Sequence, residues 1–276
     1  MSNFEFMQRM TFGQYLPTGS VLHRLDARAR IVIFTAFLTA VTVAKGLPGL
    51  VLSLLLAVIG LLLARIPLGY ALKGLLPPLP FLVILAVIQV LMRSRGTEAA
   101  LFQFWLLRVT AGGLLEGVIL LVRFASLVLW LSLTSFTLSV SELILGLNLL
   151  LRPLRRLRLP VDDLVLMVQV TVRFIPFLTQ SAERIVKAQA SRGAAWGQGS
   201  GGVLRRVRQA LPMIVPLFLN SLRRAENLAL AMDARGYGGN AARTSMHELN
   251  FQVVDWLAVG GSLLLAGLMV VWGVVI

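Results

Sequence analysis

The sequence predicts an all-α polytopic membrane protein with about five transmembrane helices and two long cytoplasmic helices. Hydrophobic residues make up 57% of the 276 residues, charged residues only 14%, and the mean hydropathy is +0.83. A soluble domain carries about 25% charged residues. Residues 141–252 hold 15 of the 26 Lys and Arg residues together with seven acids. Because Lys and Arg concentrate on the cytoplasmic side of membrane proteins, we expect this segment to be cytoplasmic.

Five apolar segments are the candidate membrane spans: residues 31–44, 50–64, 81–92, 113–137 and 254–275. The first is short, so we expect it to extend back to Ala27 or Ala29, with Asp26 as its N-cap. We interpret residues 99–109 as an interfacial or re-entrant segment, and an extra crossing there is the alternative. With five spans and a cytoplasmic middle, the N-terminus lies inside and the C-terminus outside.

Three segments follow from this pattern: residues 1–140 with four spans, the cytoplasmic residues 141–252, and the C-terminal span at 253–276. In the middle segment, Ser141 is a candidate cap for a short amphipathic helix, and residues 150–160 form a basic connector. Helical patterns run over residues 161–192 and 203–235, and each changes from apolar to polar along its length. Prolines inside them should bend the two helices: Pro176, Pro212 and Pro216. Residues 193–202 are Gly-rich and predict a flexible loop, without the Lys of a nucleotide-binding loop.

Both long helices end on Arg-Gly. Aligned on that pair, each has Ala-Glu starting ten residues earlier, Ala four residues before the Arg and a small residue just before it. The residues are Glu183, Ala188, Ser191, Arg192 and Gly193 in one stretch, and Glu226, Ala231, Ala234, Arg235 and Gly236 in the other. Arg-Gly alone is an ordinary helix C-terminus. The repeated upstream residues favour two tips that enter two similar grooves, hence two related partner subunits, with each Arg available to a carboxylate.

Other candidate sites are weaker. Asp162 and Asp163 are adjacent and fit a helix N-terminus better than a metal or acid–base pair. The chain has no Cys, and His23 and His247 each lack a second ligand at helical spacing. Arg123 lies inside the fourth span with Glu116 two turns before it, so the two either pair or meet a partner subunit, or else Arg123 faces other helices. Attraction of the basic middle to anionic lipid headgroups is a secondary interpretation, and nucleic-acid binding is not expected.

Residues 188–193 (Ala-Gln-Ala-Ser-Arg-Gly) and 231–236 (Ala-Met-Asp-Ala-Arg-Gly) resemble the two Ala-Arg-Gly motifs of the transmembrane T component of energy-coupling factor (ECF) transporters, the EcfT/CbiQ-like family. Residues 13–20 and 22–28 are similar to its N-terminal signature, and residues 151–154 and 172–176 also fit. The resemblance covers essentially the whole chain. Ala27 stands where the family commonly has Pro, and Ser191 where it usually has Ala.

The resemblance implies a non-catalytic scaffold subunit of an ECF-type ABC importer in a bacterial or archaeal cell membrane. Two ABC ATPases (A and A′), which carry ATP and Mg, would bind the ends of two coupling helices that cross each other, and their movement would act on a separate substrate-binding S component for vitamins or metal ions. No cofactor is expected on this chain. The implied ATPase-coupling residues are Ala190, Ser191, Arg192, Gly193, Ala234, Arg235 and Gly236, supported by Ala188, Glu183, Ala231, Glu226, Pro176, Pro212 and Pro216.

Two other functions were weighed. A conventional ABC permease would line the substrate path itself and would have one short coupling loop and polar residues spread through its spans. A membrane-embedded lipid or prenyl transferase would need clustered Asp, Glu or His residues near a membrane face, and this sequence has none beyond Asp162-Asp163. The transported substrate and the choice between a shared and a dedicated module are not encoded in these motifs.

Overall fold

The computed structural model describes residues 15–16, 18–93, 100–104, 107–153, 161–193, 203–237 and 251–275. Its helices are α1 (Val21–Arg24), α2 (Ala27–Val43), α3 (Leu47–Leu63), α4 (Leu68–Lys73), α5 (Leu79–Arg93), α6 (Ala111–Thr137), α7 (Val140–Leu151), α8 (Val161–Ser191), α9 (Val203–Ala234) and α10 (Val253–Val275). The strands are β1 (Ala100–Phe104) and β2 (Leu107–Thr110). Several sequence features lie outside the described residues: residues 13–14 of the N-terminal signature, most of the basic connector, and the Gly-rich loop after Gly193.

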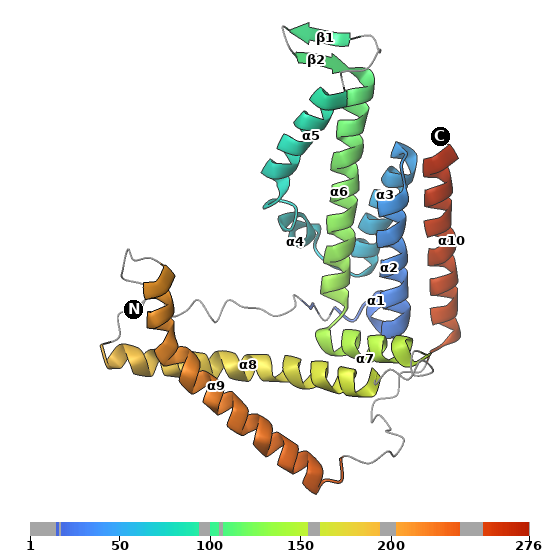
Figure 1. The fold of residues 1–276 in the computed structure, drawn as a ribbon. Helices are drawn as coiled ribbons and strands as arrows, with labels where there is room; N and C mark the ends of the chain where they lie inside the picture. Colours follow the sequence, from blue (N-terminus) through green and yellow to red (C-terminus); the bar gives the residue numbers. More distant parts are fainter. Residues whose placement is uncertain are drawn as a thin grey trace. The chain divides into compact units, whose positions relative to one another are not determined.

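The chain divides into two compact units. One contains α8 and α9, and the other contains the remaining described elements, including α10. The second unit, called the bundle here, is therefore assembled from two separated parts of the sequence. In the bundle α2, α3, α6 and α10 run alongside one another (Figure 1).

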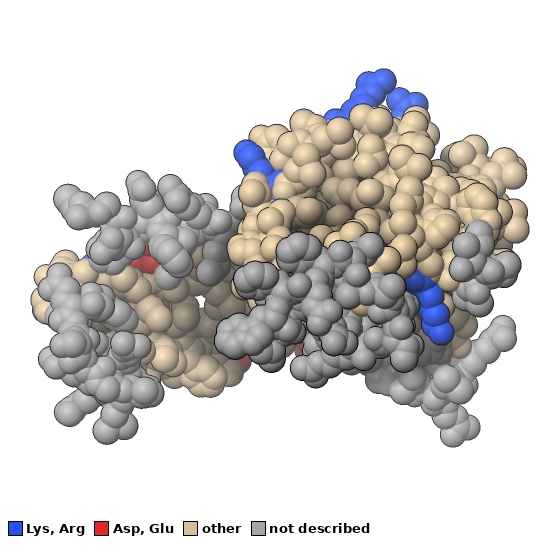
Figure 2. All heavy atoms as spheres, turned by 90° about the horizontal axis from the view of Figure 1, so that it is seen from above, with Lys and Arg blue, Asp and Glu red and all other residues tan. Residues whose placement is uncertain are grey.

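Within the described residues, two helices are long and apolar enough to cross a membrane: Ala111–Thr137, with a mean hydropathy of 2.1, and Val253–Gly273, with a mean hydropathy of 1.9. Shorter apolar helices occur at Leu47–Leu63, Leu79–Val90 and Val140–Leu151. In the view of Figure 2, most of the described surface is neither basic nor acidic. The expectation of a helical membrane protein is confirmed, whereas the count of five spans stays a prediction.

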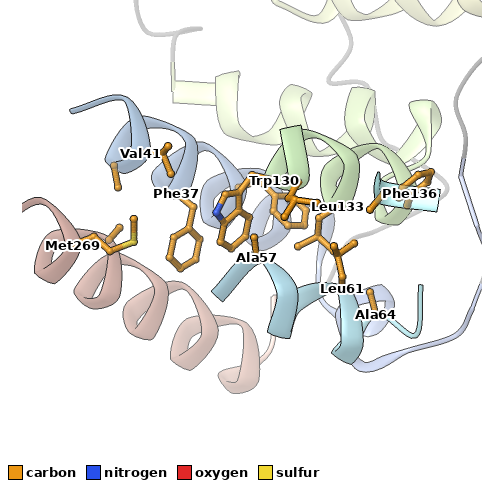
Figure 3. Close-up of a cluster of buried hydrophobic side chains, with 14 of the residues drawn as sticks. Phe37, Val41, Ala57, Leu61, Ala64, Trp130, Leu133, Phe136 and Met269 are labelled. Atoms are coloured by element: carbon orange, nitrogen blue, oxygen red, sulfur yellow. The ribbon is translucent and has the colours of Figure 1, made fainter. Parts of the chain in front are cut away.

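The core of the bundle forms where α2, α3 and α6 meet. The rings of Phe37 and Trp130 stack with centroids 4.2 Å apart and an interplanar angle of 11°. The indole Nε1 of Trp130 donates a hydrogen bond to the Ser53 hydroxyl at 3.1 Å. Leu61 and Leu133 are fully buried in the same cluster (Figure 3). Large apolar side chains fill the space between the helices, and the one polar indole group has a partner.

Small residues bring α3 and α10 into backbone contact. The Gly46 N–H donates to the Gly273 carbonyl oxygen at 2.9 Å. A Cβ at Gly49 would stand 2.5 Å from the Met269 carbonyl oxygen, closer than real Cβ atoms approach. Helices of membrane proteins pack closely through such residues, because small residues let the backbones approach.

The predicted boundaries hold for most helices. Helix α2 begins at Ala27, as expected from its short apolar run, and the Asp26 carboxylate accepts a hydrogen bond from the Arg28 N–H at 2.8 Å, which confirms the predicted N-cap. Helices α8 and α9 also match the two predicted cytoplasmic helices to within one residue.

The structure differs locally from the prediction at two places. Residues 100–104 and 107–110 pair as the antiparallel strands β1 and β2, and strands of five and four residues are too short to form the extra crossing that was the alternative. The interpretation of residues 99–109 as an interfacial or re-entrant segment stays a prediction. The cap of α7 is Ser139 instead of Ser141. Ser139 and Glu142 form a reciprocal capping box, which the pattern Ser-x-x-Glu encodes two residues before the expected start.

Candidate functional site

The candidate site is built on α8 and α9, which cross and then diverge so that their C-terminal ends lie apart (Figure 1). Helix α8 has 31 residues and α9 has 32. At 1.5 Å per residue, each is roughly 45–50 Å long. Both stay helical through their internal prolines, which are Pro176 in α8 and Pro212 and Pro216 in α9. The expected bends at these prolines stay predictions.

The end of α8 is closed by a left-handed glycine. Gly193 has a φ of 83°, and its N–H donates to the Ala190 carbonyl oxygen at 3.0 Å. The Ser191 hydroxyl donates to the Ala188 carbonyl oxygen at 2.8 Å. The helix therefore stops at this Gly, which tolerates a conformation that side chains with a Cβ rarely adopt.

The end of α9 is closed in the same way. Gly236 has a φ of 72°, its N–H donates to the Asp233 carbonyl oxygen at 2.8 Å, and the Tyr237 N–H donates to the Met232 carbonyl oxygen at 2.9 Å. This pair of bonds is a Schellman motif. The helix-cap interpretation of both Arg-Gly pairs is thus confirmed, which by itself leaves open what the arginines bind.

Each end also presents a narrow face of small side chains beside its arginine. Ala188, Ser191 and Arg192 occupy positions i, i+3 and i+4 of α8 and are all exposed. Ala231, Ala234 and Arg235 repeat the spacing and the exposure on α9. Residues three and four apart share one helix face, so each helix end has a face of short side chains with one guanidinium group beside it. We call residues 188–193 and 231–236 the two tips.

The two glutamates of the repeat have different surroundings. Glu183 accepts from the Lys187 ammonium at 2.6 Å, an i,i+4 ion pair within α8. Glu226 is exposed, and the position four residues later in α9 is Leu230. The shared glutamate therefore does not form one common contact in both helices.

Helices α8 and α9 are joined by an arginine that stacks on aromatic rings. The Arg224 guanidinium lies 3.4 Å from the Phe177 ring centroid and 5.6 Å from that of Phe174. A guanidinium over an aromatic face is attracted by the ring quadrupole, by about 0.5–1 kcal/mol at exposed sites. This contact was not predicted from the sequence, because it joins residues 47 positions apart.

Within the bundle, α7 is fixed to the first turn of α2 by a buried arginine. Arg30, which is 3% exposed, places Nη2 at 3.1 Å from Glu142 Oε1, and its Nη1 donates to the Thr137 carbonyl oxygen at 2.6 Å. Burial raises the pKa of Glu142, but hydrogen bonds from Arg30 and Ser139 and the charge of Arg30 outweigh burial, so that the pKa is lowered. This pair was not predicted from the sequence, because its residues are 112 positions apart.

The start of α10 is fixed to the same turn of α2. The Asp255 carboxylate accepts from the Asp26 N–H at 2.9 Å through Oδ1 and from the Gln252 N–H at 2.8 Å through Oδ2. Asp255 is 3% exposed. A buried carboxylate that accepts two backbone N–H groups both caps its own helix and joins the two separated parts of the bundle.

Arg123 contacts another helix, as one of the two interpretations proposed. Its Nη2 donates to the Ala44 carbonyl oxygen at 2.7 Å, at the C-terminal end of α2. A cation there also interacts favourably with the helix dipole. Asp162 and Asp163 lie in the first turn of α8, as expected, and the described residues contain no group of three His, Cys, Asp or Glu side chains that could hold a metal ion.

Comparison with known proteins adds a family. The profile of the cobalt transport protein family, CbiQ, matches residues 18–247. The energy-coupling factor transporter transmembrane protein EcfT of Lactococcus lactis subsp. cremoris is 31% identical over 266 residues, which cover 96% of this chain and 98% of the relative. The EcfT of Bacillus subtilis is 35% identical over 263 residues, 95% and 98% of the two chains. That of Acidaminococcus fermentans is 37% identical over 257 residues, 93% of each chain.

Proposed function

Because the chain belongs to the CbiQ family, whose members are membrane subunits of transporters and not enzymes, we propose that it is the coupling subunit of an energy-coupling factor importer. In this role the two tips bind two ABC ATPases, and α8 and α9 carry the ATP-driven movement to a separate small membrane protein that captures the substrate. ATP and Mg belong to the ATPases. The substrate class is a vitamin or a metal ion, and the N-terminus and both coupling helices are cytoplasmic.

One observation carries this proposal: two different helices end in the same exposed arrangement. Each tip combines a left-handed Gly, a face of small residues and one exposed arginine, Arg192 or Arg235. A face without long side chains allows close approach of a groove, and a planar guanidinium forms bidentate hydrogen bonds with a carboxylate. Two such tips, on helices that diverge, suit two homologous ATPases with acidic grooves.

The contacts within each unit support transmission of force. The Arg224–Phe177 stack gives α8 and α9 a contact at their crossing, so that a displacement of one helix is felt by the other. In the bundle, the ion pair between the buried Arg30 and the partly exposed Glu142 holds α7 against α2. An ion pair with a buried partner can fix an orientation even where it adds little net stability.

The test is co-purification of the full-length chain with its ATPases. Arg192→Glu and Arg235→Glu reverse the charge of one tip each, and we expect each to weaken ATPase binding at least tenfold and the double variant to abolish it. Arg173→Glu, at an exposed arginine of α8 outside the tips, is the matched control and should bind normally. Unchanged ATPase binding in the double variant would overturn the proposal.

Cross-linking provides a second measurement that does not depend on loss of function. The chain has no cysteine, so Ser191→Cys and Ala234→Cys each introduce a single thiol at a tip. Each should cross-link to an ATPase, whereas Thr171→Cys, exposed on α8 away from the tips, should not. A complex that imports substrate without a separate membrane capture protein would instead indicate a conventional permease.

A further inference from the structure

We propose that an open hollow between α8 and α9 binds the phosphate group of an anionic phospholipid. The hollow has a volume of about 400 Å³ and is lined by Phe177, Ser181, Arg184, Ile185, Asn220, Arg223, Arg224 and Asn227. It is separate from the tips, and the inference goes beyond the proposed coupling function, since a lipid site would serve any role of these helices at the membrane.

The polar residues that line the hollow carry hydrogen-bond donors, and none of them is Asp or Glu. Three arginines are among the lining residues, together with Ser181, Asn220 and Asn227, whose side chains carry hydroxyl and amide donors. Within the described residues none of the three arginines forms a salt bridge, and neither Glu183 nor Glu226, next in sequence to lining residues, lines the hollow. A lining with three arginines and no carboxylate favours an anionic ligand such as a phosphate group.

One of the three arginines is held in place before any ligand arrives. Arg224 lies with its guanidinium 3.4 Å from the Phe177 ring centroid. Stacking occupies a face of the guanidinium and leaves the N–H groups at its edge available for hydrogen bonds. Because less side-chain entropy is lost on binding, such a preorganised donor favours anion binding over a freely moving surface arginine.

The position of the hollow along both helices points to a lipid. Before the lining residues, α8 exposes Leu164, Met167 and Val168, and α9 exposes a longer row of apolar residues. That row consists of Leu211, Ile214, Val215, Phe218 and Leu219. Apolar surface followed along the helix by basic donors matches an acyl chain followed by a headgroup, the arrangement with which proteins bind anionic lipids.

A peptide segment fits less well. The hollow accommodates a phosphate headgroup, whereas a stretch of acidic peptide would need a longer groove to seat its backbone. An acidic protein partner is therefore an outcome that the experiment must be able to reveal.

The experiment measures lipid retention by the full-length chain in detergent, using native mass spectrometry with added phosphatidylglycerol or phosphatidylcholine. We expect wild-type protein to retain phosphatidylglycerol selectively and Arg184→Gln/Arg223→Gln to weaken retention at least tenfold. The control, Arg152→Gln/Arg173→Gln, removes two exposed arginines outside the hollow and should change retention less than twofold. Equal retention of both lipids, unchanged retention in the hollow variant, or an equal loss in the control would overturn the proposal.

Two further measurements test the role of the Arg224 guanidinium and the identity of the ligand. Arg224→Lys keeps the charge but loses the planar fork, and should weaken phosphatidylglycerol retention more than Arg173→Lys does. Inorganic phosphate at millimolar concentration should compete only weakly. If inorganic phosphate displaces the lipid fully, and binds equally well to protein without lipid, the ligand is soluble phosphate and the lipid assignment fails. If the hollow variant loses only a protein partner and no lipid, the assignment fails as well.

Discussion

Arg30 and Glu142 form an ion pair at 3.1 Å in which the arginine is almost completely buried, and this pair fastens α7 to α2. We predict that Glu142→Gln destabilises the protein by about 1–3 kcal/mol, because Arg30 keeps its charge without a counter-charge while Gln can still complete the capping box. Thermal unfolding in detergent measures the loss. Glu183→Gln, which removes an exposed i,i+4 pair with Lys187, should cost less than about 0.5 kcal/mol.

The same pair gives stability a dependence on acid pH. The pKa of Glu142 in the folded protein is lowered from 4.5, so its contribution is fully present above pH 4.5 and is lost as the pH falls through the lowered value. The difference in unfolding temperature between wild type and Glu142→Gln should therefore be constant near neutral pH and shrink in acid. A difference that grew on acidification would contradict the assignment of the ion pair.

The close contact of α3 with α10 leaves no room for a methyl group at Gly49. Gly49→Ala should destabilise the bundle by about 1–3 kcal/mol, because the new Cβ would meet the Met269 carbonyl oxygen at 2.5 Å and backbone cannot move away cheaply. Gly267→Ala is the control within α10, where nothing lies within 4 Å of the added Cβ. There the higher helix propensity of Ala should leave stability unchanged or raise it by up to about 1 kcal/mol.

Trp130 combines ring stacking with a buried hydrogen bond. Trp130→Phe should destabilise the bundle by about 1–3 kcal/mol, because it leaves the buried Ser53 hydroxyl without its indole donor and removes part of the stack on Phe37. The double variant Trp130→Phe/Ser53→Ala should recover part of the loss, since it removes both polar partners. Trp272→Phe, at an exposed tryptophan, should have little effect in detergent.

The left-handed glycines should determine how well the tips are ordered. Gly236→Ala places a Cβ at a φ of 72° and should cost about 1–2 kcal/mol locally, fraying the end of α9 and weakening ATPase binding. Gly236→Asn should retain more binding, because Asn tolerates this conformation better than Ala. Hydrogen exchange at the end of α9 together with ATPase pull-down measures both effects. If the Ala and Asn variants bound the ATPases equally well, the order of the tip would not determine ATPase binding.

Local sequence patterns predicted the parts of the structure that depend on local chemistry. The apolar runs located the helices, Asp26 located the start of α2, and Arg-Gly located the ends of α8 and α9, because caps and hydrophobic periodicity act over a few residues. The strands at residues 100–104 and 107–110 were not predicted, because periodicity alone cannot distinguish a strand from a short helix in so short an apolar run.

The contacts between helices could not be predicted from such local patterns. Glu142 meets Arg30 across 112 residues of sequence, and Arg224 meets Phe177 across 47. Nothing in the neighbourhood of either residue specifies its partner, since pairing depends on how the helices pack. The tips themselves were located from the sequence because the same short pattern occurs twice. Their partners remain a proposal, because a short local pattern does not specify what binds it.

In the sequence, α8 and α9 lie between α7 and α10, and both α7 and α10 contact the start of α2. The chain leaves the bundle after α7, which is held to Arg30, and returns at α10, whose Asp255 holds Asp26. Asp26 and Arg30 are four positions apart, at the N-cap and in the first turn of α2. During synthesis α8 and α9 are made before α10, so the hydrogen bond between Asp26 and Asp255 can form only after the last helix has been made. A chain truncated before Asp255 would contain both tips but would leave the Asp26 N–H without this carboxylate partner.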